Sequence, residues 1–153
     1  QELREEMRLG FKEIRDELIP HARAEESVFY NSLRAIDATK DLVKEGFQEH
    51  IEAEALLRSL QMRNKIDAEW RSTAQKLKDA LTHHIRDEEG KIFSAAQQYL
   101  TSQEAEMMGD AFERMKPEIR KEGFVRTTID LVANMMPPRF MTSFKSTNPN
   151  PQI

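Results

Sequence analysis

The sequence predicts an all-α fold, in which long helices pack as an antiparallel, up-down bundle. Glycine and proline are scarce, with 5 and 6 among 153 residues, so long stretches contain no helix-breaking residue. Apolar residues recur at steps of three and four, which is the spacing of one helix face. The predicted connections between the long helices are short, and short connections place successive helices antiparallel.

Composition and charge limit the classes of protein to consider. The chain has no cysteine, so it offers neither a disulfide framework nor a thiolate metal ligand. A formal net charge of -4, without a basic stripe that carries interleaved aromatic residues, predicts no nucleic-acid partner. No apolar run approaches the ~20 residues that span a bilayer, and we find no signal-peptide pattern. We therefore expect a cytoplasmic protein with no membrane partner.

The first predicted helix covers residues 2–35. Its apolar face carries Leu3, Met7, Phe11, Ile14 and Leu18. Pro20 lies inside it, removes one backbone hydrogen bond and crowds the carbonyl of Asp16, so we expect a kink just before His21. The chain opens on Gln1, within this helix and without an initiator methionine, so we expect a segment to be missing upstream.

The same periodicity predicts two more long helices. The second covers residues 38–62, and its apolar positions include Val43, Phe47 and Leu57. The third covers residues 64–98, with an apolar face that includes Ile66, Trp70, Leu77, Leu81 and Ile92. Three such helices with short connections form the body of an antiparallel bundle.

The C-terminal part predicts shorter elements. The sequence Thr-Ser-Gln-Glu, starting at Thr101, is a capping box that begins a helix over residues 102–116, and Pro117 ends that helix. A last short helix is expected over residues 122–136. The chain is thus divided into a helical bundle over residues 1–118, a C-terminal helix over 119–136 and an extended or disordered tail over 137–153.

Three of the predicted helices carry a His-x-x-x-Glu pair on the apolar face. Residues four apart on a helix are neighbours, so each pair directs one imidazole and one carboxylate toward the bundle axis. Successive pairs are about one helix-turn-helix return apart, which places all three at a similar depth. The pairs are His21 and Glu25, His50 and Glu54, and His84 and Glu88.

These six side chains are candidate metal ligands. Each buried carboxylate without a partner costs several kcal/mol, and no Lys or Arg occupies the same face to neutralise the three of them. A bound cation removes this cost. Imidazole and carboxylate ligands without thiolate suit iron, manganese or zinc. Six ligands are too many for one tetrahedral zinc ion, and they fit a two-metal site in which carboxylates bridge the ions.

Neighbouring residues have structural interpretations. A single His-x-x-x-Glu pair is usually a surface pair, and only the three together favour a metal. We interpret His83 as a flanking residue. Glu26 and Glu89 are expected to face solvent or to hydrogen-bond a ligand imidazole. The residues expected to keep the site dry are Phe29, Tyr30 and Phe93.

Three stretches carry a resemblance to a known family. They read HARAEESVFY from residue 21, EHIEAEALL from residue 49 and HHIRDEEGKIF from residue 83. They resemble the motifs of hemerythrin-like domains of the His-His-Glu cation-binding family, over about residues 1–118. The resemblance implies an up-down four-helix bundle with a non-haem di-iron centre. Members of that family bind oxygen reversibly, sense oxygen, redox state or iron, or handle iron, peroxide or nitric oxide.

The resemblance also assigns roles to single residues. Ligand positions match His21, Glu25, His50, His84 and Glu88. Glu25 and Glu88 would be the bridging carboxylates, while Glu54 stands where the oxygen carriers have another histidine. The family's first helix carries an Asp-His that donates one more ligand, and this chain has no such helix. We expect residues 102–136, or a partner chain, to fill its place.

The leading interpretation is a non-haem di-iron protein that binds O2, or a related small diatomic ligand or peroxide. Its role would be carriage, sensing, or the handling of iron and oxidative stress, with zinc or manganese as alternative metals. This interpretation makes it a binding protein rather than an enzyme. One alternative is a ferritin-like oxidase or peroxidase. Another is a metal-poor helical module that forms a homo-oligomer through the apolar groove of an absent helix.

Overall fold

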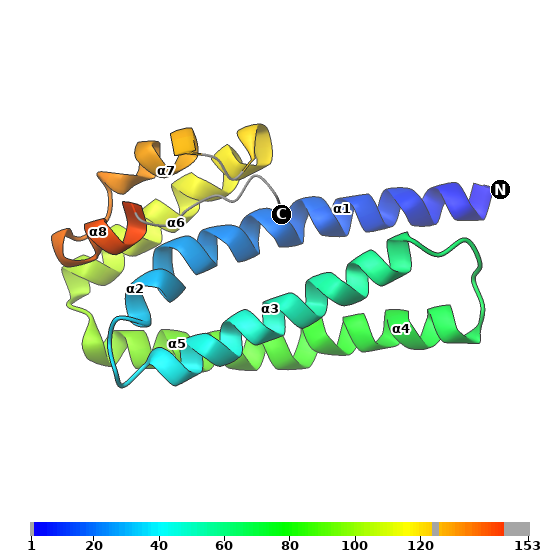
Figure 1. Ribbon diagram of the computed structural model, residues 1–153, viewed down its shortest axis with the longest axis horizontal. Helices are drawn as coiled ribbons and strands as arrows, with labels where there is room; N and C mark the ends of the chain where they lie inside the picture. The colour runs from blue at the N-terminus through cyan, green and yellow to red at the C-terminus, as the bar shows by residue number, and fades with distance from the viewer. Residues whose placement is uncertain (1, 124–125, 146–153) are drawn as a thin grey trace.

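The computed structural model describes residues 2–123 and 126–145, and these residues form helices joined by short connections (Figure 1). No strand occurs in this part of the chain. Successive long helices run in opposite directions, so the fold is the all-α, up-down bundle that the sequence predicts. None of the described helices is both long and apolar enough to cross a bilayer.

Three long helical runs form the body of the bundle. The first comprises α1 (Glu2–Glu25), the π-helical segment η1 (Glu26–Tyr30) and α2 (Asn31–Leu33). The second is α3 (Lys40–Gln61). The third comprises α4 (Ala68–Asp79), the π-helical segment η2 (Ala80–Ile85) and α5 (Arg86–Tyr99). All three predicted long helices therefore exist, but two of them contain a π-helical turn that the sequence analysis did not predict.

Helix α6 (Ser102–Glu122) begins with the predicted capping box. The Glu104 amide donates to Thr101 Oγ1 at 3.1 Å, and the Thr101 amide donates to Glu104 Oε1 at 3.0 Å. The prediction that Pro117 ends this helix is wrong, because the helix continues past it. Ile119, beyond the proline, is buried, so packing offsets the backbone hydrogen bond that Pro117 cannot donate.

The sequence after α6 forms a shorter helix than predicted. Gly123 follows α6 with a φ of +80°, a left-handed conformation that glycine adopts without steric cost. The prediction of one helix over residues 122–136 is therefore wrong at its start, and α7 (Arg126–Ala133) occupies the middle of that range. Residues 124–125 lie outside the described part of the chain.

Helix α8 (Pro138–Lys145) lies where the sequence analysis predicts an extended or disordered tail. That prediction is wrong for these eight residues, and the remainder of the predicted tail, residues 146–153, lies outside the described residues. Proline suits the first position of a helix, where its missing N–H leaves no bond unmade. Phe140 and Phe144, four residues apart, are both buried, and this packing holds the helix on the bundle.

Helix α6 provides a fourth helix for one half of the bundle. It lies alongside α1 and also contacts η1 and α5 (Figure 1). The ring of Phe112 on α6 meets the His21 ring edge-on, with 5.3 Å between centroids. Helices α7 and α8 extend this layer, since α7 packs on α6 and α8 packs on α2. Residues of the chain itself thus lie beside the C-terminal half of α1, as one of the two expected alternatives requires.

The apolar interior formed by the described residues has two parts. We call the first the covered core, because helices α6, α7 and α8 contribute to it. Its large buried side chains include Leu33, Ile92, Met108, Ile129 and Phe144. We call the second the open core, because its described members come from α1, α3, α4, η2 and the loop before α4, and none from α6–α8. Its buried members are Ala53, Leu57, Leu60, Trp70, Leu77 and Ile85.

Candidate metal centre

A layer of charged side chains lies between the two cores. On α3, for example, His50 stands between Val43 of the covered core and Leu57 of the open core. The buried and partly buried apolar residues of the first and third helical runs also pass from the open core to the covered core near the level of His50. We call this group the polar layer, and its members are His21, Arg23, Glu25, Glu26, His50, Glu54 and Glu89.

Glu25 is the centre of the polar layer. Its side chain is 1% exposed, although it carries a carboxylate. The Oε1 atom lies 3.0 Å from His50 Nε2 and accepts a hydrogen bond from the Tyr30 hydroxyl at 3.2 Å. The Oε2 atom lies 3.5 Å from His21 Nε2, is buried, and accepts no hydrogen bond from any described residue. One oxygen of this carboxylate therefore has two close polar partners, and the other has only the longer contact with His21.

His50 is held between two carboxylates. Its Nε2 faces Glu25, and its Nδ1 lies 2.7 Å from Glu26 Oε2. Burial lowers the pKa of this imidazole, but the hydrogen bonds and charges of Glu25 and Glu26 outweigh burial and raise the pKa to about 9. The Tyr30 ring stacks on the His50 ring, with 5.3 Å between centroids and 22° between planes. A pKa raised in this way favours the protonated imidazolium of His50 at neutral pH, with both ring nitrogens directed at carboxylates.

His21 links the first helical run to the third. Its Nε2 lies 3.5 Å from Glu89 Oε1 as well as from Glu25 Oε2. The close contact with the Glu25 carboxylate, followed by the contact with Glu89, raises the pKa of His21 to about 9 against the opposing effect of burial. Burial by itself would raise the pKa of Glu25, but the two imidazoles outweigh burial and lower this pKa to about 2.

Glu54 has a cationic partner, contrary to the sequence analysis. Arg23 donates to both oxygens of Glu26, at 2.8 and 3.0 Å, and it also donates to Glu54 Oε1. The expectation that no Lys or Arg neutralises the carboxylates of this layer is therefore wrong. Arg23 lies off the predicted apolar face, but its long side chain reaches across to α3.

His84 and Glu88 do not join the cluster around Glu25. His84 is exposed, and Glu88 pairs with Lys91 at 3.3 Å. Glu89, which the sequence analysis expects to face solvent or to hydrogen-bond a ligand imidazole, faces the imidazole of His21. The cause is η2, since a π-helical turn contains about one residue more than an α-helical turn and rotates everything after it. The signal available in the sequence is that Glu89 lies on one helix face with Ile85, Ile92 and Ala96, at steps of four and three, and these apolar residues are buried.

The residues present fit a metal cation. His21, Glu25 and Glu89 each offer one ligand atom, and these atoms lie within 4.8 Å of one another. Imidazole and carboxylate oxygen are ligands that iron, manganese and zinc share. The Oε2 of Glu25 is a buried acceptor without a hydrogen bond from any described residue, and such acceptors in folded proteins nearly always have a hydrogen-bond partner. A bound cation would take the place of the missing hydrogen-bond donor.

Comparison with known proteins gives the class of this chain. The model of the family described as Hemerythrin HHE cation binding domain matches residues 1–96, well over half of the chain. The chain therefore belongs to the hemerythrin HHE cation-binding family, as its motifs predict, and is a cation-binding helical bundle.

A curated protein also shows similarity. It is the DNA nickase of Nostoc sp. (strain PCC 7120 / SAG 25.82 / UTEX 2576), to which the chain is 29% identical over 111 residues. The match covers 72% of this chain and 31% of the nickase, so the chain spans about a third of that relative. No solved structure matches the chain.

Proposed function

We propose that the chain is a non-haem di-iron protein that binds O2, or a related diatomic ligand or peroxide, at the polar layer. The observation that carries this proposal is the environment of Glu25, where a buried carboxylate faces two imidazoles and keeps one oxygen without a hydrogen bond from any described residue. The family's cation-binding description supports it. The role would be carriage, sensing, or the handling of iron and oxidative stress.

One ion would be held by His21, Glu25 and Glu89. His50 would join them once Nε2, the ring nitrogen that faces Glu25, has lost its proton. Iron, when bound, supplies an open coordination position and redox chemistry for the small ligand. The chain's own contribution is to orient Glu25 through the Tyr30 hydroxyl and to keep the layer between two apolar cores.

A second ion would draw on Glu54, His84 and Glu88, the other predicted ligands. Glu88 supports this assignment, because its Oε2 is a second buried oxygen without a hydrogen-bond partner among the described residues. The proposal requires all three side chains to rearrange, because Glu88 lies beside Glu45, and Glu45 and Glu54 are nine residues apart on α3, or roughly 13 Å along its axis. Glu54 must leave Arg23, and His84 must turn inward from solvent.

The test is metal content per chain by elemental analysis, with absorption spectra of the same sample before and after exposure to air. We expect about two irons per chain, the count of a di-iron bundle, and near-ultraviolet bands that change with oxygen. Glu25→Gln should lose most of the iron, while Glu52→Gln, an exposed carboxylate on α3, should keep it. Unchanged iron in Glu25→Gln would refute the assignment, and steady peroxide turnover with an electron donor would favour an oxidase or peroxidase.

The likeness to a DNA nickase favours a second candidate, which is metal-dependent cleavage of one DNA strand. Metal ions held by carboxylates and imidazoles can activate water for such hydrolysis. The net charge of -4 disfavours it, because DNA binding depends on neutralising phosphates. Incubation with supercoiled plasmid and Mg²⁺ or Mn²⁺ distinguishes the two. Nicking that Glu25→Gln abolishes would replace the first proposal, and intact plasmid would remove the second.

A further inference from the structure

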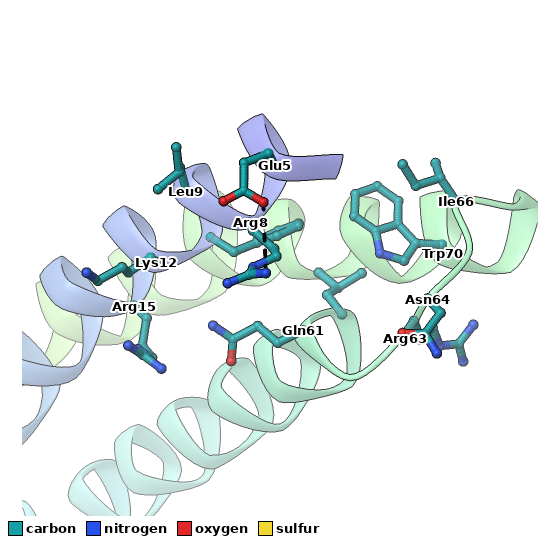
Figure 2. A pocket seen from close by; sticks show the side chains of 12 residues that line it. Glu5, Arg8, Leu9, Lys12, Arg15, Gln61, Arg63, Asn64, Ile66 and Trp70 are labelled. Atoms are coloured by element: carbon teal, nitrogen blue, oxygen red, sulfur yellow. Dashed lines mark ion pairs between the residues drawn. The ribbon is translucent and has the colours of Figure 1, made fainter. Parts of the chain in front are cut away.

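A cavity opens beside the open core, away from the polar layer. It has a volume of about 470 Å³ and lies between the N-terminal half of α1, the end of α3 and the start of α4 (Figure 2). Pockets for small ligands usually measure ~300–1,000 Å³. Phe11 on its wall and His21 of the polar layer are ten residues apart on α1, or roughly 15 Å along the helix axis. The cavity is therefore distinct from the candidate metal centre.

Basic side chains surround this cavity. Four of its lining residues are cationic and one, Glu5, is anionic; the four are Arg8, Lys12, Arg15 and Arg63. The first three recur at steps of four and three on α1, so they share one helix face. Figure 2 shows Arg8 and Arg15 extending from α1 toward the side of the cavity that carries Gln61. This arrangement makes the rim attractive to an anion.

Most of these basic side chains form only weak ion pairs, or none, with the acidic side chains that the structure describes. Arg8 lies 3.8 Å from Glu5, and both side chains are exposed, so this pair contributes little. Arg15 lies at the same distance from Asp16. Lys12 has no ion-pair partner among the side chains that the structure describes, and Arg63 alone is well paired, with Glu69 at 2.9 Å. An incoming anion can therefore meet cations without first breaking strong pairs.

The wall beneath these cations is apolar and aromatic. Phe11 packs edge-on against Trp70, with 5.5 Å between ring centroids. Leu60 and Ile66 complete this wall, and Leu60 and Trp70 are buried members of the open core. An anion with no apolar part would leave this surface wet, whereas a flat apolar body would cover it. The site thus combines charge attraction at the rim with apolar contact below it.

We propose that this cavity is a binding site for a small organic anion with an aromatic body. The carboxylate, sulfonate or phosphate of the ligand lies among Arg8, Lys12 and Arg15, and its ring system lies against Phe11 and Trp70. Binding here does not depend on the metal proposal, since no polar-layer residue lines the cavity.

The chain contains a direct reporter for this site. Trp70 is the single tryptophan of the sequence, so all tryptophan emission comes from the wall of the cavity. The probe is anilinonaphthalene sulfonate, a fluorescent aromatic anion, and the comparison compound is uncharged phenylnaphthylamine. We expect the anion to quench Trp70 with a saturable, one-to-one titration that weakens as salt is added. The uncharged compound should bind at least fivefold more weakly.

Charge-reversal variants complete the test. Lys12→Glu should weaken the anion about fivefold to tenfold, because it replaces attraction by repulsion at the rim. Lys44→Glu is the matched control, since it makes the same charge change on an exposed position of α3 beside the covered core. Equal binding of the charged and uncharged compounds would overturn the proposal. So would equal affinities of Lys12→Glu and Lys44→Glu, or the absence of quenching by the anion.

Discussion

The covered core and the open core are built on the same three helical runs, but only the covered core also receives side chains from α6, α7 and α8. On one side of the polar layer, α6, α7 and α8 close the bundle, and Met108 and Phe144 are completely buried. On the other side, Phe11 and Ile66 are only partly buried, and Leu9 is 55% exposed. The apolar stripes of the long helices look alike in the sequence, so the difference comes from what packs on them.

We expect stability and the capacity to bind a ligand to lie in different halves of the molecule. A closed core of interlocking side chains carries most of the free energy of folding, because each buried apolar group adds to it. A half that none of the helices α6–α8 covers is expected to open at lower free energy and to keep space for a ligand. The candidate metal centre lies at the boundary between the two halves.

The largest expected difference is between two phenylalanine truncations. Phe144→Ala empties a fully buried site in the covered core and should lower the free energy of unfolding by about 3–5 kcal/mol. Phe11→Ala removes the same atoms from the open core, where the side chain is already partly in water. It should cost less than half as much. Urea denaturation of both variants checks this, and equal losses would break the distinction between the cores.

A pair of glycine substitutions tests the packing at the boundary. In Gly46→Ala the new Cβ would lie 2.8 Å from the ring of Tyr30, which is buried and stacked on His50. We expect a loss of about 1–3 kcal/mol from this overpacking. Gly90→Ala meets nothing within 4 Å and should stabilise α5 by about 0.5–1 kcal/mol. Thermal melting of the two variants measures the difference, and equal stabilities would contradict it.

The polar layer predicts the pH dependence of the metal-free protein. The pKa values of His21 and His50 rise from 6.5 to about 9 on folding, so their contribution is present below pH 6.5 and is lost as pH rises through 9. The pKa of Glu25 falls from 4.5 to about 2, so its contribution is present above pH 4.5 and is lost as pH falls through 2. Stability should therefore be greatest between pH 4.5 and 6.5.

Denaturation midpoints across this range, with chelator present, measure the profile. His50→Gln should reduce the loss of stability at alkaline pH, while His83→Gln, an exposed histidine of η2, should leave it unchanged. Cation affinity should change in the opposite direction and increase with pH, because a metal must displace the imidazole proton. A flat stability profile from pH 6.5 to 9 would show that the layer does not hold its histidines protonated.

The smallest expected effect concerns the start of the covering layer. Thr101→Ala removes the side chain that caps α6 and should cost about 0.5–2 kcal/mol. The N-terminus of α6 keeps other contacts in this variant, because Arg139 of α8 donates to both oxygens of Glu104 and to the Tyr99 carbonyl. Ser102→Ala, which leaves the capping bonds in place, is the control. Equal urea midpoints for the two variants would show that the cap adds nothing.

The sequence by itself determined the three long helical runs, the capping box and the family. Helix periodicity and caps are local properties, since they depend on residues three or four apart. For the same reason the sequence placed His21, Glu25 and His50 on inward faces, and the structure brings these three together. The family motifs follow from that same pattern, and the family match over residues 1–96 confirms them.

Tertiary structure alone decided the register after η2, the ion pair between Arg23 and Glu54, and the presence of α8. The π-helical turn η2 moves Glu89 into the place expected for Glu88, because the register after such a turn depends on the packing of the whole helix. Contacts far apart in the sequence decide the other differences. Arg23 reaches Glu54 on another helix, and buried phenylalanines fold α8 onto the bundle where the sequence indicated a tail. A sequence pattern records local spacing, whereas these outcomes depend on which distant surfaces meet.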